Sequence, residues 1–144
     1  MTDIESLDTR MQPRVRKYIW RCAQEGIKVI VLETRRLLST QMAYYARGRA
    51  PVDLVKEYYK RCGLWAITDA EAAVQNTKTL YSKHIDGLAV DIAPSKDGKP
   101  WWDAPKDLWE RMFKIAEDEC DLDACASGKW QAWNWDWPHC QMRE

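Results

Sequence analysis

The sequence predicts an α+β fold in a single domain spanning residues 1–144, with a small sheet flanked by helices. A chain of 144 residues can bury one substantial hydrophobic core. Several segments carry apolar residues at helical spacing, whereas two shorter ones show the continuous apolar run or the period-2 alternation of strands. No stretch approaches the ~20 consecutive apolar residues that a membrane span requires.

Helices are predicted where apolar side chains form one stripe between capping and breaking residues. They are expected over residues 13–25, over a segment that Ser39 or Thr40 can cap and Gly48 ends, and over residues 51–63, 69–75 and 104–120. Pro13 suits the first turn of the N-terminal helix, and Gly26 suits the position after its end. We therefore assign residues 1–27 to an N-terminal helical segment.

Strands are predicted on both sides of the central helices. The run Val29–Leu32 indicates a buried strand within residues 28–34, and residues 75–81 are expected to be extended. Beyond Gly87, apolar residues alternate with small or acidic ones, so one face of this strand lies in the core and Asp91 lies on the other. Residues 94–100 are rich in turn formers and predict a loop.

The tail from Trp130 to Trp137 alternates tryptophan with other residues, which suggests an edge of the sheet. Such an aromatic face either lines a groove for carbohydrate or packs in the interior. The sequence leaves both alternatives open.

The chain has two histidines, and each lies in a compact polar motif. Gly87 can adopt backbone angles that fold His84 back toward the strand carrying Asp91. A carboxylate on a partly enclosed face is costly unless it is paired or binds a metal. Together with His139, these residues would leave a fourth coordination position open, as in catalytic zinc sites. We interpret them as a mononuclear zinc site with Asp136 as the base; the alternative for either histidine is an ordinary hydrogen-bonded residue.

The five cysteines are odd in number, scattered and without a CxxC pair, which indicates reduced thiols rather than a disulfide framework. A rival closed metal site could be formed by cysteines near the C-terminus together with the last histidine. Its ligands would be Cys120, Cys125, His139 and Cys140.

The pattern Ser-x-His-x-x-Gly-x-Ala-x-Asp over residues 82–91, followed by Asp-x-Pro-His over residues 136–139, resembles the zinc D-Ala-D-Ala carboxypeptidases and L-alanyl-D-glutamate endopeptidases. These peptidoglycan peptidases share a fold with hedgehog signalling domains, so the resemblance implies a small, mainly antiparallel sheet flanked by helices. It also implies one Zn2+ per chain. The ligands would be His84, Asp91 and His139, with Asp136 as the general base.

Residues 34–49 resemble the second signature of this family, a Thr-x-Arg followed by Gln, Tyr and Gly-Arg. The resemblance places Arg36 at the active site, supporting the substrate carbonyl or carboxylate; the adjacent Arg35 leaves the register open by one residue. A guanidinium fork suits this role because it can hold a carboxylate through two hydrogen bonds and stabilise an oxyanion. Further candidates for substrate binding are Ser82, Gln41, Arg49 and Trp137.

The resemblance implies a zinc-dependent peptidase that cleaves stem peptides of peptidoglycan through a zinc-activated water, with Asp136 as general base. We expect an L-alanyl-D-glutamate endopeptidase of the phage endolysin kind. The alternatives are a D-Ala-D-Ala carboxypeptidase or dipeptidase and a non-catalytic, zinc-stabilised cell-wall binding module. Imidazole and carboxylate ligands also suit cobalt or manganese.

The resemblance covers residues 28–141, so we expect no separate cell-wall-binding domain. No secretory signal is recognisable in residues 1–24, so we expect synthesis in the host cytoplasm and action at the bacterial wall after release. We expect a monomer without membrane insertion and without a nucleic-acid partner.

Charge is unevenly spread along a chain of zero net charge. Residues 1–63 carry 13 basic and 7 acidic side chains, a net +6, whereas residues 64–144 carry 9 and 15, a net −6. This asymmetry indicates either two solvated faces or a basic wall that meets an anionic substrate such as cell-wall carboxylates.

Overall fold

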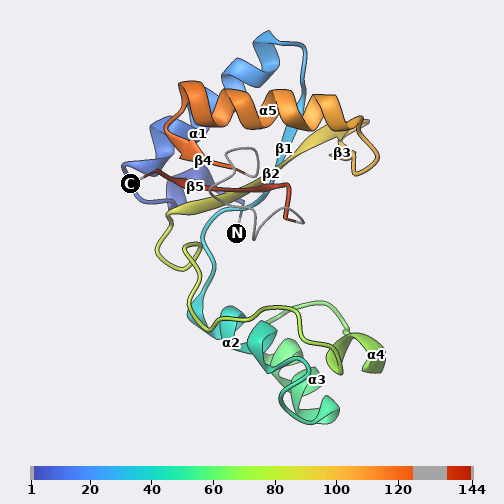
Figure 1. The fold of residues 1–144 in the computed structure, drawn as a ribbon. Helices are drawn as coiled ribbons and strands as arrows, with labels where there is room; N and C mark the ends of the chain where they lie inside the picture. The colour runs from blue at the N-terminus through green and yellow to red at the C-terminus, as the bar shows by residue number, and fades with distance from the viewer. Residues whose placement is uncertain (1, 125–135, 144) are drawn as a thin grey trace. The chain divides into compact units, whose positions relative to one another are not determined.

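The computed structural model describes residues 2–124 and 136–143, which fall into two units (Figure 1). The first unit comprises the chain up to Arg35 and from Asp86 onward, and the second comprises Arg36–Ile85. The first contains η1 (Ile4–Ser6), α1 (Met11–Gln24), β1 (Val29–Glu33), β2 (Ala89–Lys96), β3 (Lys99–Pro100), α5 (Lys106–Glu119), β4 (Leu122–Asp123) and β5 (His139–Met142). The second contains α2 (Leu38–Ala46), α3 (Val52–Arg61) and α4 (Asp69–Ala72).

The sheet of the first unit has the strand order β1-β2-β5-β4, and β3 forms a hairpin with β2. All of these pairings are antiparallel. In the described residues, β2 is therefore central, with β1 on one side and β5 on the other (Figure 1). The predicted α+β class, with a small antiparallel sheet flanked by helices, is confirmed.

The hydrophobic core of the first unit lies between the sheet and helices α1 and α5. Tyr18 of α1 and Trp109 of α5 are among its largest fully buried side chains, and Val90 and Ile92 reach the same core from β2. The prediction that one face of this strand lies in the core is therefore confirmed. However, Ala89 and Ala93 are also completely buried, so the second face of β2 is covered rather than open.

Several boundaries differ from those predicted. Strand β1 is partly exposed along its whole length, not buried. Strand β2 continues to Lys96, so the expected loop over residues 94–100 is instead a tight hairpin. Its two turn residues, Asp97 and Gly98, both have positive φ, as the Asp-Gly turn of a two-residue hairpin requires.

The second unit is a small cluster of three helices with its own buried residues. Its buried hydrophobic cluster consists of Ala43, Val55, Tyr59, Ile67 and Ala72. The prediction that Ser39 or Thr40 caps α2 is wrong: both lie inside the helix, whose N-cap position is Leu37, without a side-chain cap. Helix α4 is shorter than predicted and begins with a capping box between Thr68 and Glu71.

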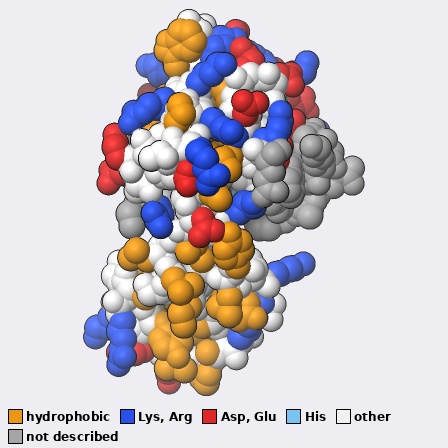
Figure 2. Space-filling view, turned by 90° about the vertical axis from the view of Figure 1, so that its left-hand side faces the viewer, with side chains coloured by type: hydrophobic (Ala, Val, Ile, Leu, Met, Phe, Trp, Pro, Cys, Tyr) orange, Lys and Arg blue, Asp and Glu red, His pale blue; other side chains and the backbone are white. Residues whose placement is uncertain are grey.

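Large apolar side chains lie exposed on the second unit, and Figure 2 shows hydrophobic side chains gathered on its surface. They include Leu37, Leu38, Met42, Trp65, Val74, Leu80 and Tyr81.

Some sequence predictions lie outside the described residues. These are the alternating tryptophans Trp130, Trp133 and Trp135, and the Cys125 ligand of the rival closed site. Among the residues that are described, no helix is both long enough and apolar enough to cross a membrane.

Candidate metal centre

Asp91 and His139 are brought together by the backbone ladder between two strands. They are direct partners in the antiparallel pairing of β2 with β5, so their side chains leave the same face of the sheet. The Nδ1 atom of His139 lies 3.4 Å from Oδ1 of Asp91. The side chains of His139 and Asp91 are 12% and 20% exposed, so both are largely shielded from water.

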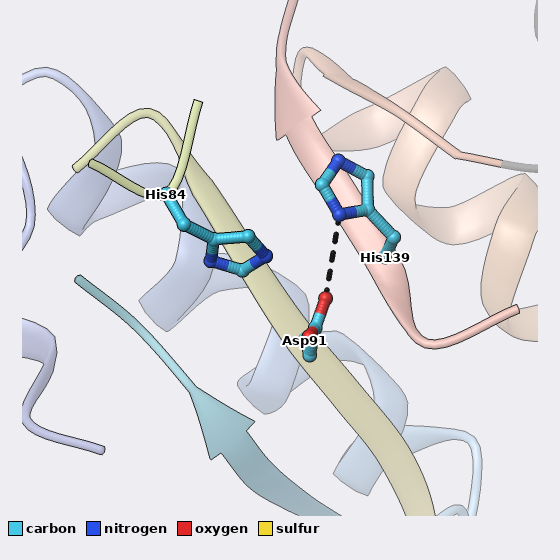
Figure 3. Close-up of side chains that lie close together, drawn as sticks. All are labelled: His84, Asp91 and His139. Atoms are coloured by element: carbon cyan, nitrogen blue, oxygen red, sulfur yellow. Dashed lines mark ion pairs between the residues drawn. The ribbon is translucent and has the colours of Figure 1, made fainter. Parts of the chain in front are cut away.

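His84 is held by the turn that precedes β2. Its backbone N–H donates to Oγ of Ser82, and its carbonyl accepts from the backbone N–H of Arg36 at 2.9 Å. The residue is only 2% exposed. The ligand atoms of His84, Asp91 and His139 all lie within 4.8 Å of one another, and Figure 3 shows the three side chains around a common point.

The donor set of this group suits a transition-metal ion. Zinc binds imidazole nitrogen and carboxylate oxygen at roughly 2.0–2.2 Å, so two such ligands in tetrahedral arrangement lie about 3.4 Å apart. The pair formed by His139 and Asp91 has this separation. Two imidazoles and one carboxylate are also the donor set of catalytic rather than structural zinc sites. The described residues thus place together the three ligands that the sequence predicts.

Asp136 lies at the edge of the same group. Its Oδ2 atom is 3.9 Å from Nδ1 of His139, and its carbonyl accepts from the backbone N–H of His139 in the turn before β5. Its side chain is 34% exposed, more than those of Asp91 and His139. A carboxylate that is adjacent to the ligands and reachable by solvent is suited to exchanging protons with water.

Arg36 is fixed within its own unit by two neighbours. Its guanidinium donates to Oε1 of Gln41 at 2.6 Å and lies 5.0 Å from the centre of the Tyr44 ring. Gln41 is completely buried, and its amide NH2 donates to the carbonyl of Thr79 at 2.8 Å. Gln41, predicted to bind substrate, therefore uses its amide oxygen to hold Arg36 and its amide NH2 to hold the segment near Thr79.

The other predicted substrate-binding residues make local contacts. Arg49 lies over the Tyr45 ring at 3.9 Å and donates to the Tyr45 carbonyl. Ser82 shapes the turn before His84 through its hydroxyl and its backbone carbonyl. Trp137 is partly buried and packs edge-on against Trp109 at 5.6 Å between ring centres, as in the packing alternative for the tail.

Sequence reasoning missed Gln141, whose Oε1 atom lies 3.3 Å from Nε2 of His139. The residue is only 4% exposed. The available signal was its spacing: residues i and i+2 of a strand point to the same face, so a strand beginning at His139 places Gln141 beside it.

Burial sets the protonation of two core thiols in the first unit. Removal from water raises the pKa of Cys22 from 9.0 to about 12, and the neighbouring Cys120 adds to the effect. Burial likewise raises the pKa of Cys120 to about 11.

Comparison with solved structures identifies the fold. The chain resembles the vancomycin-resistance D,D-pentapeptidase VanY in complex with Zn(II), with TM-score 0.56, 18% identity, and coverage of 96% of this chain and 73% of VanY. It also resembles VanYB in complex with D-alanine-D-alanine (TM-score 0.57, 18% identity, coverage 96% and 72%). A third match is the Serratia marcescens L-Ala D-Glu endopeptidase ChiX (TM-score 0.53, 18% identity, coverage 96% and 82%).

Searches against family models and against curated proteins gave no match. At 18% identity, the likeness to solved structures concerns architecture, and it extends over 96% of the chain. The chain therefore has the fold shared by the VanY and ChiX peptidases.

Proposed function

We propose that this chain is a zinc-dependent peptidoglycan peptidase. The observation that carries the proposal is the group of His84, Asp91 and His139, whose ligand atoms lie within 4.8 Å on a fold shared with a zinc-bound D,D-pentapeptidase. The substrate class is supported by VanYB, solved with D-alanine-D-alanine, and by ChiX, an L-Ala D-Glu endopeptidase.

Different residues of the chain have different roles in peptide hydrolysis. When bound, zinc would supply Lewis-acid polarisation and lower the pKa of water from ~16 toward ~7. Asp136 takes a proton from the attacking water and delivers it to the leaving amine. Arg36, oriented by Gln41, holds the substrate carbonyl or carboxylate with its guanidinium fork.

The position of the cleaved peptide bond distinguishes two kinds of peptidoglycan peptidase. We favour the L-alanyl-D-glutamate bond, in an endolysin-like role, and the likeness to ChiX supports this choice. The likeness to VanYB with its bound dipeptide favours a second candidate, a D-Ala-D-Ala carboxypeptidase. A carboxypeptidase must recognise a free terminal carboxylate, whereas an endopeptidase needs a groove that is open at both ends.

Digestion of purified peptidoglycan tests both parts. Protein loaded with zinc and protein treated with chelator are incubated with the same sacculi, and the products are identified by mass spectrometry. We expect new amino-terminal D-glutamate from the loaded protein alone. Release of D-alanine without new D-glutamate termini would move the assignment to a carboxypeptidase.

Two variants are compared with the parent protein. Asp136→Ala should bind zinc but cleave no peptidoglycan, whereas His84→Ala should lose both zinc binding and cleavage. Absence of any product from correctly metallated protein would refute the peptidase. If the inactive protein still sedimented with sacculi, the assignment would change to a non-catalytic cell-wall binding module.

A further inference from the structure

Gln141 occupies the position on β5 that adjoins the metal-facing ring of His139. Alternation along the strand puts both side chains on the face that carries Asp91, while Cys140 between them points into the hydrophobic core. Opposite Gln141 on β2 stands Ala89, which has a small side chain. The Gln141 amide is thus buried on this face of the sheet, adjacent to the His139 imidazole.

The contacts of His139 differ at its two ring nitrogens. Nδ1 faces Oδ1 of Asp91 at 3.4 Å, whereas Nε2 faces Oε1 of Gln141 at 3.3 Å. A neutral imidazole carries one proton, and the nitrogen that binds a metal must be the unprotonated one. An acceptor at Nε2 favours the proton there and leaves the lone pair on Nδ1, on the side where Asp91 lies.

The carboxylates near Nδ1 act in the opposite sense. Without a metal, Asp91 at 3.4 Å and Asp136 at 3.9 Å both attract a proton to Nδ1, which would block the ligand position. The Oε1 atom of Gln141, 3.3 Å from Nε2, opposes them. We propose that Gln141 is a positioning residue that keeps His139 in the Nε2–H tautomer, so that Nδ1 is free to bind a cation together with Asp91.

The proposal concerns the metal site of the proposed peptidase, but its first test needs neither metal nor substrate. Since the chain has only two histidines, selective 15N labelling of histidine yields two pairs of ring-nitrogen signals, one pair per imidazole, and a His84→Asn variant assigns them. Spectra of metal-free protein are recorded at about pH 8.5, where an ordinary imidazole is neutral. We expect a protonated Nε2 and an unprotonated Nδ1 for His139.

Two substitutions of similar shape separate hydrogen bonding from packing. Gln141→Met removes the acceptor, and we expect the His139 proton to shift toward Nδ1. Gln141→Glu keeps an acceptor, so the Nε2–H tautomer should persist. Cys140→Ala alters the opposite, core-facing side of the same strand; it should lower stability while leaving the tautomer unchanged.

Zinc affinity gives the second measurement, by competition with a chromogenic chelator. Loss of a partner behind a histidine ligand typically weakens binding 10–100-fold, and we expect a loss of about this size for Gln141→Met. Gln141→Glu and Cys140→Ala should stay within about threefold of the parent protein.

The inference is overturned if Gln141→Met has the parent's tautomer and the parent's zinc affinity. It is equally overturned if Gln141→Glu fails to keep the Nε2–H form while the protein remains folded. A parent protein that shows the expected tautomer and binds zinc, yet cleaves no peptidoglycan, would refute the proposed activity and leave the role of Gln141 standing.

Discussion

Asp136 is the residue on which proton transfer in the proposed reaction depends. Its carboxylate is 3.9 Å from the His139 ring and one-third exposed, so it can exchange protons without being a member of the ligand group. We predict that Asp136→Asn lowers kcat by ~10²–10⁴-fold with zinc affinity nearly unchanged. Steady-state kinetics on a stem peptide and chelator competition measure the two quantities, and a kcat near the parent value would contradict the role.

Arg36 depends on Gln41 for its orientation. Gln41→Leu removes an acceptor 2.6 Å from the guanidinium and the donor to the carbonyl of Thr79 inside a buried site. We expect unfolding free energy to fall by about 1–3 kcal/mol, together with a loss in kcat/KM. The same change at exposed Gln75 should alter stability by less than about 0.5 kcal/mol. Equal effects of both substitutions in urea denaturation would contradict the prediction.

Among single residues, the sequence predicts those whose chemical role requires one particular kind of side chain. The three predicted metal ligands lie together because their motifs combine reactive groups with the glycine and strand pattern that direct them. The roles of Gln41 and Gln141 could not be predicted in the same way. An amide can bind substrate, fill space or orient a neighbour, and only the contacts of the folded chain distinguish these roles.

Among the elements, the turn into β2 depends most on one glycine. Gly87 has φ of +73°, and a Cβ at this position would lie 2.7 Å from the backbone nitrogen of Asp8. That nitrogen also donates to the Gly87 carbonyl, so the backbone there cannot easily retreat. The glycine thus serves the close approach of the N-terminal segment as well as the turn beside His84.

We predict that Gly87→Ala is more destabilising than Gly98→Ala. Both positions have positive φ, for which an L-residue costs roughly 1–2 kcal/mol, but no atom lies within 4 Å of a Cβ at Gly98. The steric penalty therefore falls on Gly87 alone. Urea denaturation of metal-free protein compares the two variants directly, and equal midpoints would show that contact with Asp8 carries no cost.

Helix positions were largely predictable because amphipathic spacing is a local property. Helix α1 starts two residues before its predicted position, and α5 stays within its predicted range. The second face of β2 was not predictable, since the alanines that flank Asp91 are compatible with either exposure or burial. The hairpin at Asp97-Gly98 was predictable in principle from its turn dipeptide, but a cluster of turn formers looks the same in a loop.

Across the first unit, buried thiols link stability to alkaline pH. The folded state keeps Cys22 and Cys120 protonated, with pKa values raised to about 12 and about 11, whereas an unfolded thiol ionises near 9.0. Above about pH 9 the unfolded state binds fewer protons, so unfolding free energy must fall as pH rises. We predict a progressive fall from about pH 9 to about pH 12, measured by urea titration.

A substitution identifies the source of this fall. Cys22→Ala should remove part of the pH dependence. Identical curves for the parent protein and Cys22→Ala would rule out the contribution of that core thiol.

The first unit has a hydrophobic core and a strand ladder that involve no metal, so we predict that chelation leaves its secondary structure intact. Added zinc should then stabilise the folded state, by about 2.7 kcal/mol at a hundredfold excess over Kd. Circular dichroism and thermal unfolding in chelator and in zinc test this. Loss of far-UV signal on chelation would show instead that the metal is required for folding.

The backbone pairing of Asp91 with His139 has a practical consequence. Two of the three ligands are set by main-chain hydrogen bonds, so a change of ion need not involve refolding. Zinc, which is spectroscopically silent, could be replaced by cobalt in the same protein molecules, and the visible absorption bands of cobalt would then report the number and geometry of ligands. The coordination sphere could thus be observed optically while a substrate enters it.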